Sequence, residues 1–244
     1  MTAAKAGTRA RFGLTLGLVV ALAAVGNAAI NLLIPAPLYV FVALLLALLA
    51  VLVAVRVGGC STRDLGLDRE QLGHGLRLGA AVAAVLGVVL AVGAALPATR
   101  DLFADRRVDQ QSVTLLLYHT LVRIPLGTAV AEETLFRGSL FGLLLERHAP
   151  GRAATLSSVL FGLWHVLPTL DTMRLNAAGA AVRDDPARTR VAVAASVAVT
   201  AVAGLGLSWL RFAGGSLVAP TVVHAALNSS AFAAARLVGR STRR

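Results

Sequence analysis

The chain has 244 residues, of which 57% are hydrophobic and only 14% are charged, and its mean hydropathy is +0.77. A soluble domain would carry about a quarter charged residues, whereas here the apolar residues form runs close to the roughly 20 residues that cross a bilayer, so a soluble enzyme is excluded. The net charge of +11 does not indicate a nucleic-acid partner, because the arginines gather at the ends of the apolar runs, where they meet lipid headgroups, and are not interleaved with aromatic residues.

The apolar runs predict an all-α, polytopic protein with seven or eight transmembrane helices. The first run follows basic residues as in a signal peptide, but it is too long for one and is expected to remain as the first span. The positive-inside rule places the N-terminus and the arginine-containing loop 58–77 in the cytoplasm. Pro125 separates 111–123 from 126–147, which leaves the count open between seven and eight. In chain order the expected spans are 12–34, 37–57, 78–97, 111–123 joined to 126–147, 153–170, 191–211 and 216–238.

Two further features of the composition concern the compartment. Lys5 is the only lysine among 23 basic residues, and such an arginine-rich chain is typical of a GC-rich bacterial coding sequence. We therefore expect an integral protein of the bacterial cytoplasmic membrane.

Cys60 is the only cysteine, which excludes an intrachain disulfide and a thiolate metal cluster. This residue is therefore expected to be a small packing residue.

The stretch AEETLFRG, residues 131–138, places charged residues inside an apolar run. On a helix, Glu133 and Arg137 are four residues apart and share a face, in the order that favours an ion pair. Glu132 projects about 100° away and has no cation close to it in the sequence. Because an unpaired carboxyl in apolar surroundings suits a general base near neutral pH, the doublet is predicted to divide into a structural Glu133 and a chemical Glu132.

Two later runs also carry polar residues one helical turn apart. FGLWH places Phe161 and His165 on one face, and HAALN places His224 and Asn228 on one face. A charged side chain at the centre of a spanning helix costs about 2.5–3.5 kcal/mol on insertion scales, so such residues usually face a cavity. We expect these side chains to meet Glu132 around a shared pocket inside the helical bundle.

The ordered motifs EExxxR, FxxxH and HxxxN resemble those of the CPBP family of intramembrane proteases, which includes the CaaX prenyl-endopeptidases and bacteriocin-processing or immunity proteins. The resemblance covers about residues 111–238 and extends to EETLFRG and GSLVAPTVVHAALN. Each motif alone is weak, but the ordered trio in apolar runs is specific. The resemblance implies variable transmembrane helices and a cytoplasmic loop in 1–110, a protease core in 111–239 and a basic tail in 240–244.

The resemblance also implies an activity, that of an intramembrane endopeptidase acting on a peptide or a membrane-protein substrate. Glu132 would activate a water molecule for attack on a peptide carbonyl, and His165 would help to position and deprotonate it. His224 and Asn228 would donate hydrogen bonds to the oxyanion. Structural support is assigned to Glu133, Arg137 and Phe161. The prenylated substrates of CaaX processing are not carried over, because a bacterial host would lack them.

No cofactor is expected, and zinc is the alternative. The chain has no HExxH motif, so the geometry of the common zinc peptidases is absent. Two histidines and one carboxylate are nevertheless a known catalytic ligand set. A metal-dependent enzyme would use His165, His224 and Glu132.

Two other functions compete with the peptidase. A non-catalytic membrane protein, such as a bacteriocin-immunity factor or an envelope scaffold, would not need the full set of Glu, His, His and Asn. A proton-coupled transporter would use intramembrane Glu and His as a relay, but no internal repeat is evident. For single residues, His165 has the alternative of a core histidine, and His224 and Asn228 that of interhelical hydrogen bonding. Trp164 and Trp209 are expected to anchor or pack rather than to bind substrate.

Overall fold

The computed structural model describes residues 3–103, 108, 111–175 and 185–241, and all of the regular structure in these residues is helical. The prediction of an all-α protein is therefore confirmed. The labelled helices are α1 (Ala3–Leu32), α2 (Tyr39–Val53), α3 (Leu72–Ala95), α5 (Val113–Tyr118), α6 (Ala131–Glu133), α7 (Phe141–Leu145), α8 (Pro150–Trp164), α9 (Val166–Leu175), α11 (Pro186–Ala213) and α12 (Val218–Ser241).

Six helices in the described residues are long and apolar enough to cross a membrane. They are Thr8–Leu32, Ala36–Gly58, Arg69–Ala95, Val113–Leu145, Pro150–Met173 and Pro186–Ala213. Helix α12 has 24 residues, which is about 36 Å at 1.5 Å per residue, but its polar residues, among them His224 and Asn228, lower its hydropathy. With α12 the described part of the chain has seven long helices, which is one of the two predicted counts.

The segments on either side of Pro125 form one continuous helix, Val113–Leu145, and therefore do not make two separate spans. Proline lacks an N–H and its ring displaces the carbonyl four residues earlier, which usually breaks or kinks a helix. Here His119–Val130 forms wider, π-type turns that contain the proline, and such turns absorb a mismatch in the hydrogen-bond ladder. A second π-type stretch, Thr134–Leu140, follows α6. The acidic doublet thus lies on a short α-helical turn between two widened stretches.

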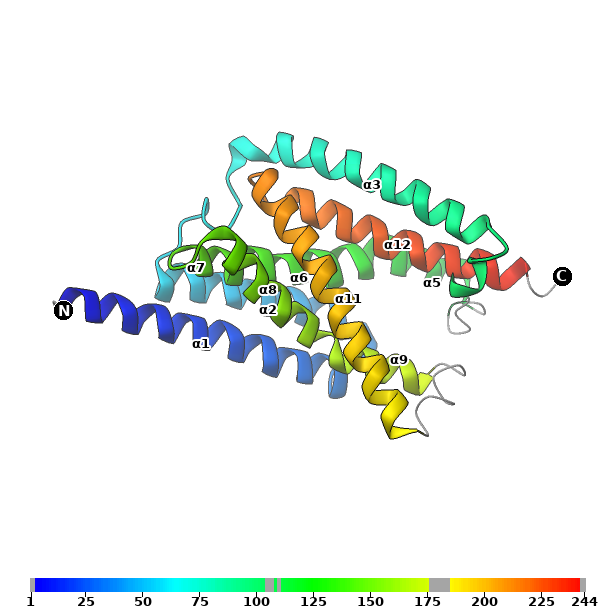
Figure 1. Cartoon of the computed structure of the whole chain (residues 1–244), viewed down its shortest axis with the longest axis horizontal. Helices are drawn as coiled ribbons and strands as arrows, with labels where there is room; N and C mark the ends of the chain where they lie inside the picture. Colours follow the sequence, from blue (N-terminus) through cyan, green and yellow to red (C-terminus); the bar gives the residue numbers. More distant parts are fainter. Residues whose placement is uncertain (1–2, 104–107, 109–110, 176–184, 242–244) are drawn as a thin grey trace.

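The long helices form a bundle in which α3 and α12 run side by side, α11 crosses in front, and α1 and α2 lie on the side opposite α3 (Figure 1). Glycines allow two of these helix pairs to approach closely. A Cβ atom at Gly79 of α3 would lie 2.9 Å from the carbonyl oxygen of Ala219 in α12. One at Gly162 of α8 would lie 2.6 Å from the carbonyl oxygen of Val197 in α11. Small residues at helix crossings are typical of membrane bundles.

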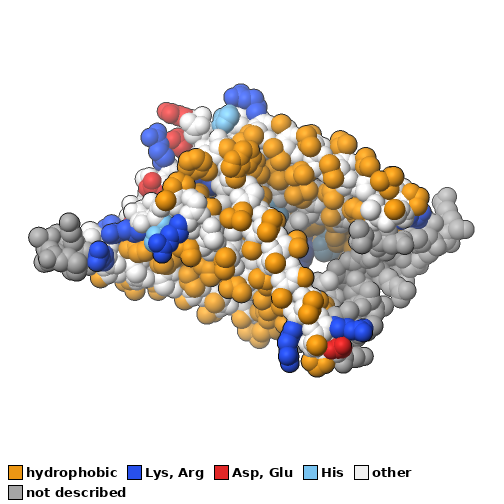
Figure 2. Space-filling model, viewed as in Figure 1, with side chains coloured by type: hydrophobic (Ala, Val, Ile, Leu, Met, Phe, Trp, Pro, Cys, Tyr) orange, Lys and Arg blue, Asp and Glu red, His pale blue; other side chains and the backbone are white. Residues whose placement is uncertain are grey.

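Hydrophobic side chains cover much of the outer face shown in Figure 2, while most of the visible arginines lie toward its ends. Val85 and Val88 of α3 and Val199 and Val202 of α11 are 64–68% exposed. Valines so exposed on long apolar helices are expected to face lipid rather than water. Together with the six candidate spans, this surface identifies an integral membrane protein.

A polar loop, residues 59–71, lies at the end of the bundle where the chain begins (Figure 1). The buried guanidinium of Arg211 donates from Nη2 to the carbonyl oxygens of Arg63 and Asp64, at 3.3 and 3.0 Å, and so ties this loop to α11. At the same end, Arg147 donates to the carbonyl oxygen of Thr8 at 3.0 Å. Arginines from distant parts of the sequence therefore gather at this end.

Candidate active site

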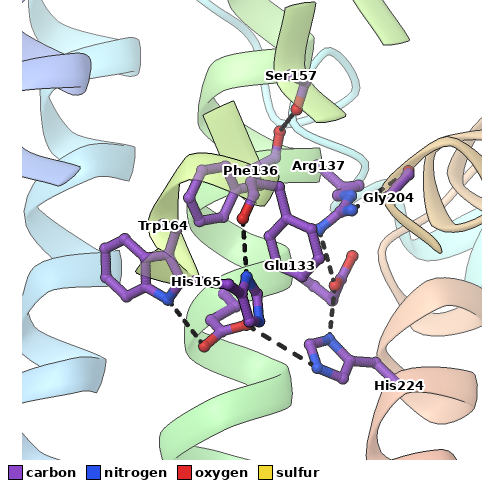
Figure 3. A network of polar contacts seen from close by, with 10 residues as sticks. Glu133, Phe136, Arg137, Ser157, Trp164, His165, Gly204 and His224 are labelled. Carbon is purple, nitrogen blue, oxygen red and sulfur yellow. Dashed lines mark hydrogen bonds and ion pairs between the residues drawn. The ribbon is translucent and has the colours of Figure 1, made fainter. Parts of the chain in front are cut away.

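The predicted ion pair between Glu133 and Arg137 is present at the centre of the bundle (Figure 3). Nη1 of Arg137 lies 3.1 Å from Oε1 of Glu133, and both side chains are 0% exposed. Arg137 also donates from Nη2 to the carbonyl oxygen of Gly204 in α11 at 3.2 Å, and its guanidinium lies 4.1 Å from the centre of the Phe161 ring. The pair therefore joins α6, α8 and α11.

Glu133 has a second partner that the sequence did not indicate. Its Oε1 lies 2.8 Å from Nδ1 of His224 in α12, whose side chain is buried. Because a carboxylate only accepts, Nδ1 of His224 carries the proton in this bond. Besides its predicted pairing with Arg137, Glu133 therefore also orients one of the predicted site histidines.

Glu132 is 6% exposed and has different neighbours for its two oxygens. Oε1 accepts a hydrogen bond of 3.1 Å from the indole N–H of Trp164. Oε2 lies 3.9 Å from Nε2 of His224 and accepts no hydrogen bond from the described residues. Trp164, which the sequence predicts to anchor or pack rather than to bind substrate, thus also binds the Glu132 carboxylate directly.

His165 lies at the end of α8, where the helix turns into α9. Its Nδ1 is 2.8 Å from the carbonyl oxygen of Phe161, as the one-turn spacing of the motif allows. Since the carbonyl accepts, Nδ1 carries the proton, and a neutral ring has its lone pair on Nε2. The Phe161 ring lies edge-on to the rings of His165 and His224, with centroids 4.6 and 6.1 Å apart. Phe161 therefore packs against both histidines.

A cavity of about 380 Å³ brings most of the predicted site residues together. Its lining includes Phe161, His165, His224 and Asn228, with apolar residues of α3 and α11 forming much of the wall. Asn228 is exposed, one turn beyond His224. Glu132 is not among the lining residues of this cavity and adjoins it through His224. The three motifs therefore converge in space, from helices that are far apart in the sequence.

The charged groups at the site are nearly balanced. Two buried carboxylates face one buried guanidinium, so the cluster of Glu132, Glu133 and Arg137 carries a formal charge of −1 when His224 is neutral and zero when it is protonated. Buried charges persist only when they are paired and hydrogen bonded. The imidazole between the two carboxylates is the group that can complete this balance.

The residues of the alternative zinc site have other partners in the structure. Within residues 3–103, 108, 111–175 and 185–241, no group of three His, Cys, Asp or Glu side chains is arranged to hold a metal ion. The alternative set of His165, His224 and Glu132 belongs to these residues. One nitrogen of each histidine is already engaged, with the Phe161 carbonyl and with Glu133.

Residues 114–230 match the family model described as type II CAAX prenyl endopeptidase Rce1-like. This range contains all three motifs and confirms the predicted resemblance to the CPBP family. No curated protein and no solved structure matches the chain. Residues 114–230 are thus similar to the Rce1-like type II CAAX prenyl endopeptidases.

Proposed function

We propose that this protein hydrolyses a peptide bond within the membrane with a water molecule that Glu132 activates. The similarity to this family supports an intramembrane endopeptidase with a peptide or protein substrate. The observation that carries the finer proposal is the surroundings of Glu132. One oxygen is held by Trp164 and the other, in a buried position, accepts nothing from the described residues and lies 3.9 Å from His224.

The proposed reaction begins with transfer of a proton from water to Oε2 of Glu132. The resulting hydroxide attacks the carbonyl carbon of the substrate, and the proton held by Glu132 then passes to the leaving amine as the C–N bond breaks. His165 assists by accepting a hydrogen bond from the same water at Nε2, because its Nδ1–H is engaged by the carbonyl of Phe161. Glu132 thus acts first as a general base toward the water and then as a general acid toward the leaving amine.

We assign stabilisation of the oxyanion to His224 and Asn228, which line the same cavity one turn apart. With Nδ1–H of His224 bound to Glu133, Nε2 can donate only when the ring is protonated. Donors fixed in a site without bulk water stabilise a developing negative charge far more than they would in water.

No cofactor is needed for these steps, and a zinc-dependent reaction remains the alternative to test. The measurement is cleavage of a peptide library by the purified protein with and without a strong chelator. Activity that is unaffected by the chelator and by added zinc supports the metal-free mechanism. Activity that is lost with the chelator and restored by zinc contradicts it.

We propose that the end carrying loop 59–71 faces the cytoplasm of a bacterium. Arg147 and Arg211 lie at this end with the N-terminus, and cytoplasmic ends of membrane proteins carry an excess of arginine and lysine. The orientation is tested with Arg9→Cys and a thiol reagent that does not cross membranes. We expect no labelling of this cysteine in intact cells. Labelling without permeabilisation would mean that the N-terminus lies outside.

The catalytic assignment is tested with Glu132→Gln, which keeps the shape of the side chain and removes the base. We expect the rate of cleavage to fall about 100-fold or more, because general acid–base catalysis contributes about that much. Insertion into the membrane and yield on purification should be unchanged. Glu146→Gln is the matched control, because Glu146 lies beyond α7, at the end of the same long helix, and outside the cavity. A Glu132→Gln protein that cleaves as fast as the wild type would falsify the assignment.

A further inference from the structure

Trp164 lies at a break between two helices, and the sequence just after it explains the break. Helix α8 ends at Trp164 and α9 begins at Val166. Pro168 lies four residues after Trp164 and has no N–H, so it cannot donate the helical hydrogen bond to the carbonyl of Trp164. This carbonyl therefore needs a donor from elsewhere, since a polar backbone group inside a membrane bundle is costly to leave unpaired.

The donor is Asn27, which belongs to α1. Its Nδ2 lies 2.9 Å from the carbonyl oxygen of Trp164, and the side chain is buried. Asn31, one turn further along α1, donates from its own Nδ2 to Oδ1 of Asn27 at 2.6 Å. An amide whose oxygen is already accepting presents its nitrogen to the next partner. Asn31 thus orients Asn27 toward the helix break.

The side chain of Trp164 then transmits this arrangement to the site. Its indole N–H, which can only donate, holds Oε1 of Glu132 at 3.1 Å. The ring packs edge-on against Phe136, with centroids 5.5 Å apart and an interplanar angle of 80°. Asn27 therefore holds the backbone of Trp164, and Phe136 holds its ring. The carboxylate of Glu132 can turn only by breaking its hydrogen bond to the indole.

We propose that Asn27 and Trp164 are positioning residues that hold Glu132 with Oε2 toward His224. This inference rests on the proposed function, and it gives α1 a role in positioning the site residues. Asn27 lies outside the residues 114–230 that match the family. The N-terminal helix thus supplies a polar contact to the site as well as apolar packing.

The contact itself is tested without any assay of activity. In a Trp209→Phe background, Trp164 is the only tryptophan, and its fluorescence reports the surroundings of the indole N–H. We expect the emission maximum to shift when Glu132 is replaced by Ala, and to stay in place in the control Glu146→Gln, because Glu146 lies beyond α7. An unchanged emission maximum in Glu132→Ala overturns the proposal.

The kinetic test uses Trp164→Phe, which keeps an aromatic ring next to Phe136 and removes the donor. We expect kcat to fall roughly 10- to 100-fold, as is typical for loss of a hydrogen bond to a charged group. KM should change by less than about twofold, because Trp164 does not line the cavity that contains His165, His224 and Asn228. A lowered kcat with an equally altered KM, or a wild-type kcat, contradicts a positioning role.

The role of Asn27 is tested by a double-mutant cycle with Pro168. Asn27→Ala alone should lower kcat, and Asn31→Ala should lower it less, because Asn31 acts only through Asn27. Pro168→Ala restores an N–H four residues after Trp164, which can then donate to the Trp164 carbonyl. In that background, Asn27→Ala should lower kcat clearly less than it does in the wild type. Additive effects in the cycle would mean that Asn27 does not act through the Trp164 carbonyl.

The two proposals fail in different ways. If Glu132→Gln retains full activity, the proposed function is wrong whatever the fluorescence shows. If Glu132→Gln is inactive while Trp164→Phe and Asn27→Ala match the wild type, the catalytic assignment stands and only the positioning role is lost.

Discussion

The buried centre of the bundle and the polar loop 59–71 each contain an ion pair, in very different surroundings. In the centre, Arg137 and Glu133 are 3.1 Å apart and both side chains are 0% exposed. In the loop, Arg63 and Asp68 are closer, at 2.9 Å, but their side chains are 78% and 17% exposed. Burial rather than distance distinguishes the two pairs, because water solvates exposed charges whether or not they are paired, whereas buried charges have no other partner.

The two regions are consequently held together by different interactions. At the centre, Glu133 links Arg137 to His224, so the ion pair is part of the site. At the loop, the buried contact is the guanidinium of Arg211 with two backbone carbonyls, and the ion pair lies outside it. Mutations that remove one partner at a time test this difference.

The largest effect is expected for Arg137→Met, which leaves Glu133 buried without its cation. Removing one partner of a buried pair costs about 3–5 kcal/mol, and we expect this loss in unfolding experiments in detergent together with loss of cleavage. The double variant Glu133→Gln, Arg137→Met should lose less stability than Arg137→Met alone. If Arg137→Met is no less stable than Arg63→Met in the loop, the distinction between the regions fails.

The next effect concerns Cys60, a buried group inside the loop region. Its side chain is 3% exposed, and its Sγ lies 3.2 Å from Oε1 of Glu146. Burial, followed by the hydrogen bond to Glu146, raises the pKa of the thiol to about 12. The folded state therefore favours the protonated thiol, and this preference is fully present below the ordinary pKa of about 8.5.

We expect a maleimide at pH 8 to label Cys60 more than about 100-fold more slowly in the folded protein than in the unfolded protein, because only the thiolate reacts. Glu146→Gln removes the negative charge beside the thiol and should speed the labelling of the folded protein. Equal rates in folded and unfolded protein would show that this part of the loop is open to solvent.

A smaller effect is expected for Arg211→Met. This change removes the two hydrogen bonds to the carbonyls of Arg63 and Asp64 and leaves the loop carbonyls without that donor. Loss of a buried donor costs about 1–3 kcal/mol. The measurement is the Tm in detergent, and proteolysis within 59–71 should become faster. Stability equal to that of the wild type would mean that Arg211 does not hold the loop.

The smallest effect is expected for Asp68→Asn. Hydrogen bonds from Arg63 and from the backbone N–H of Glu70 lower the pKa of Asp68, so any contribution to stability is present above the ordinary pKa of about 3.9 and is lost only as the pH falls through the lowered value. Between pH 5 and pH 9 we expect no change in Tm beyond experimental error, at low or high salt. A clear loss would show that exposed and buried pairs are equivalent here.

Some features of the site were predictable from the sequence because they depend on residues within one or two turns of a helix. The ion pair of Glu133 with Arg137, and the contact of His165 with the carbonyl of Phe161, both follow from a spacing of four residues. The membrane class follows from composition alone. The same local reasoning left two alternatives at Pro125, because the π-type turns that keep the helix continuous are not evident from hydrophobic periodicity.

The sequence by itself thus determined the helices, the membrane class and the polar faces that they carry. Only the tertiary structure decided which of these faces meet: His224 reaches Glu133 across 91 residues of sequence, Trp164 reaches Glu132 across 32, and Asn27 reaches Trp164 across 137. A hydrogen bond requires its two atoms to lie about 3 Å apart, and that distance is set by how separate helices pack. The close helix crossings, with their glycines, are therefore what turns three polar motifs into one site.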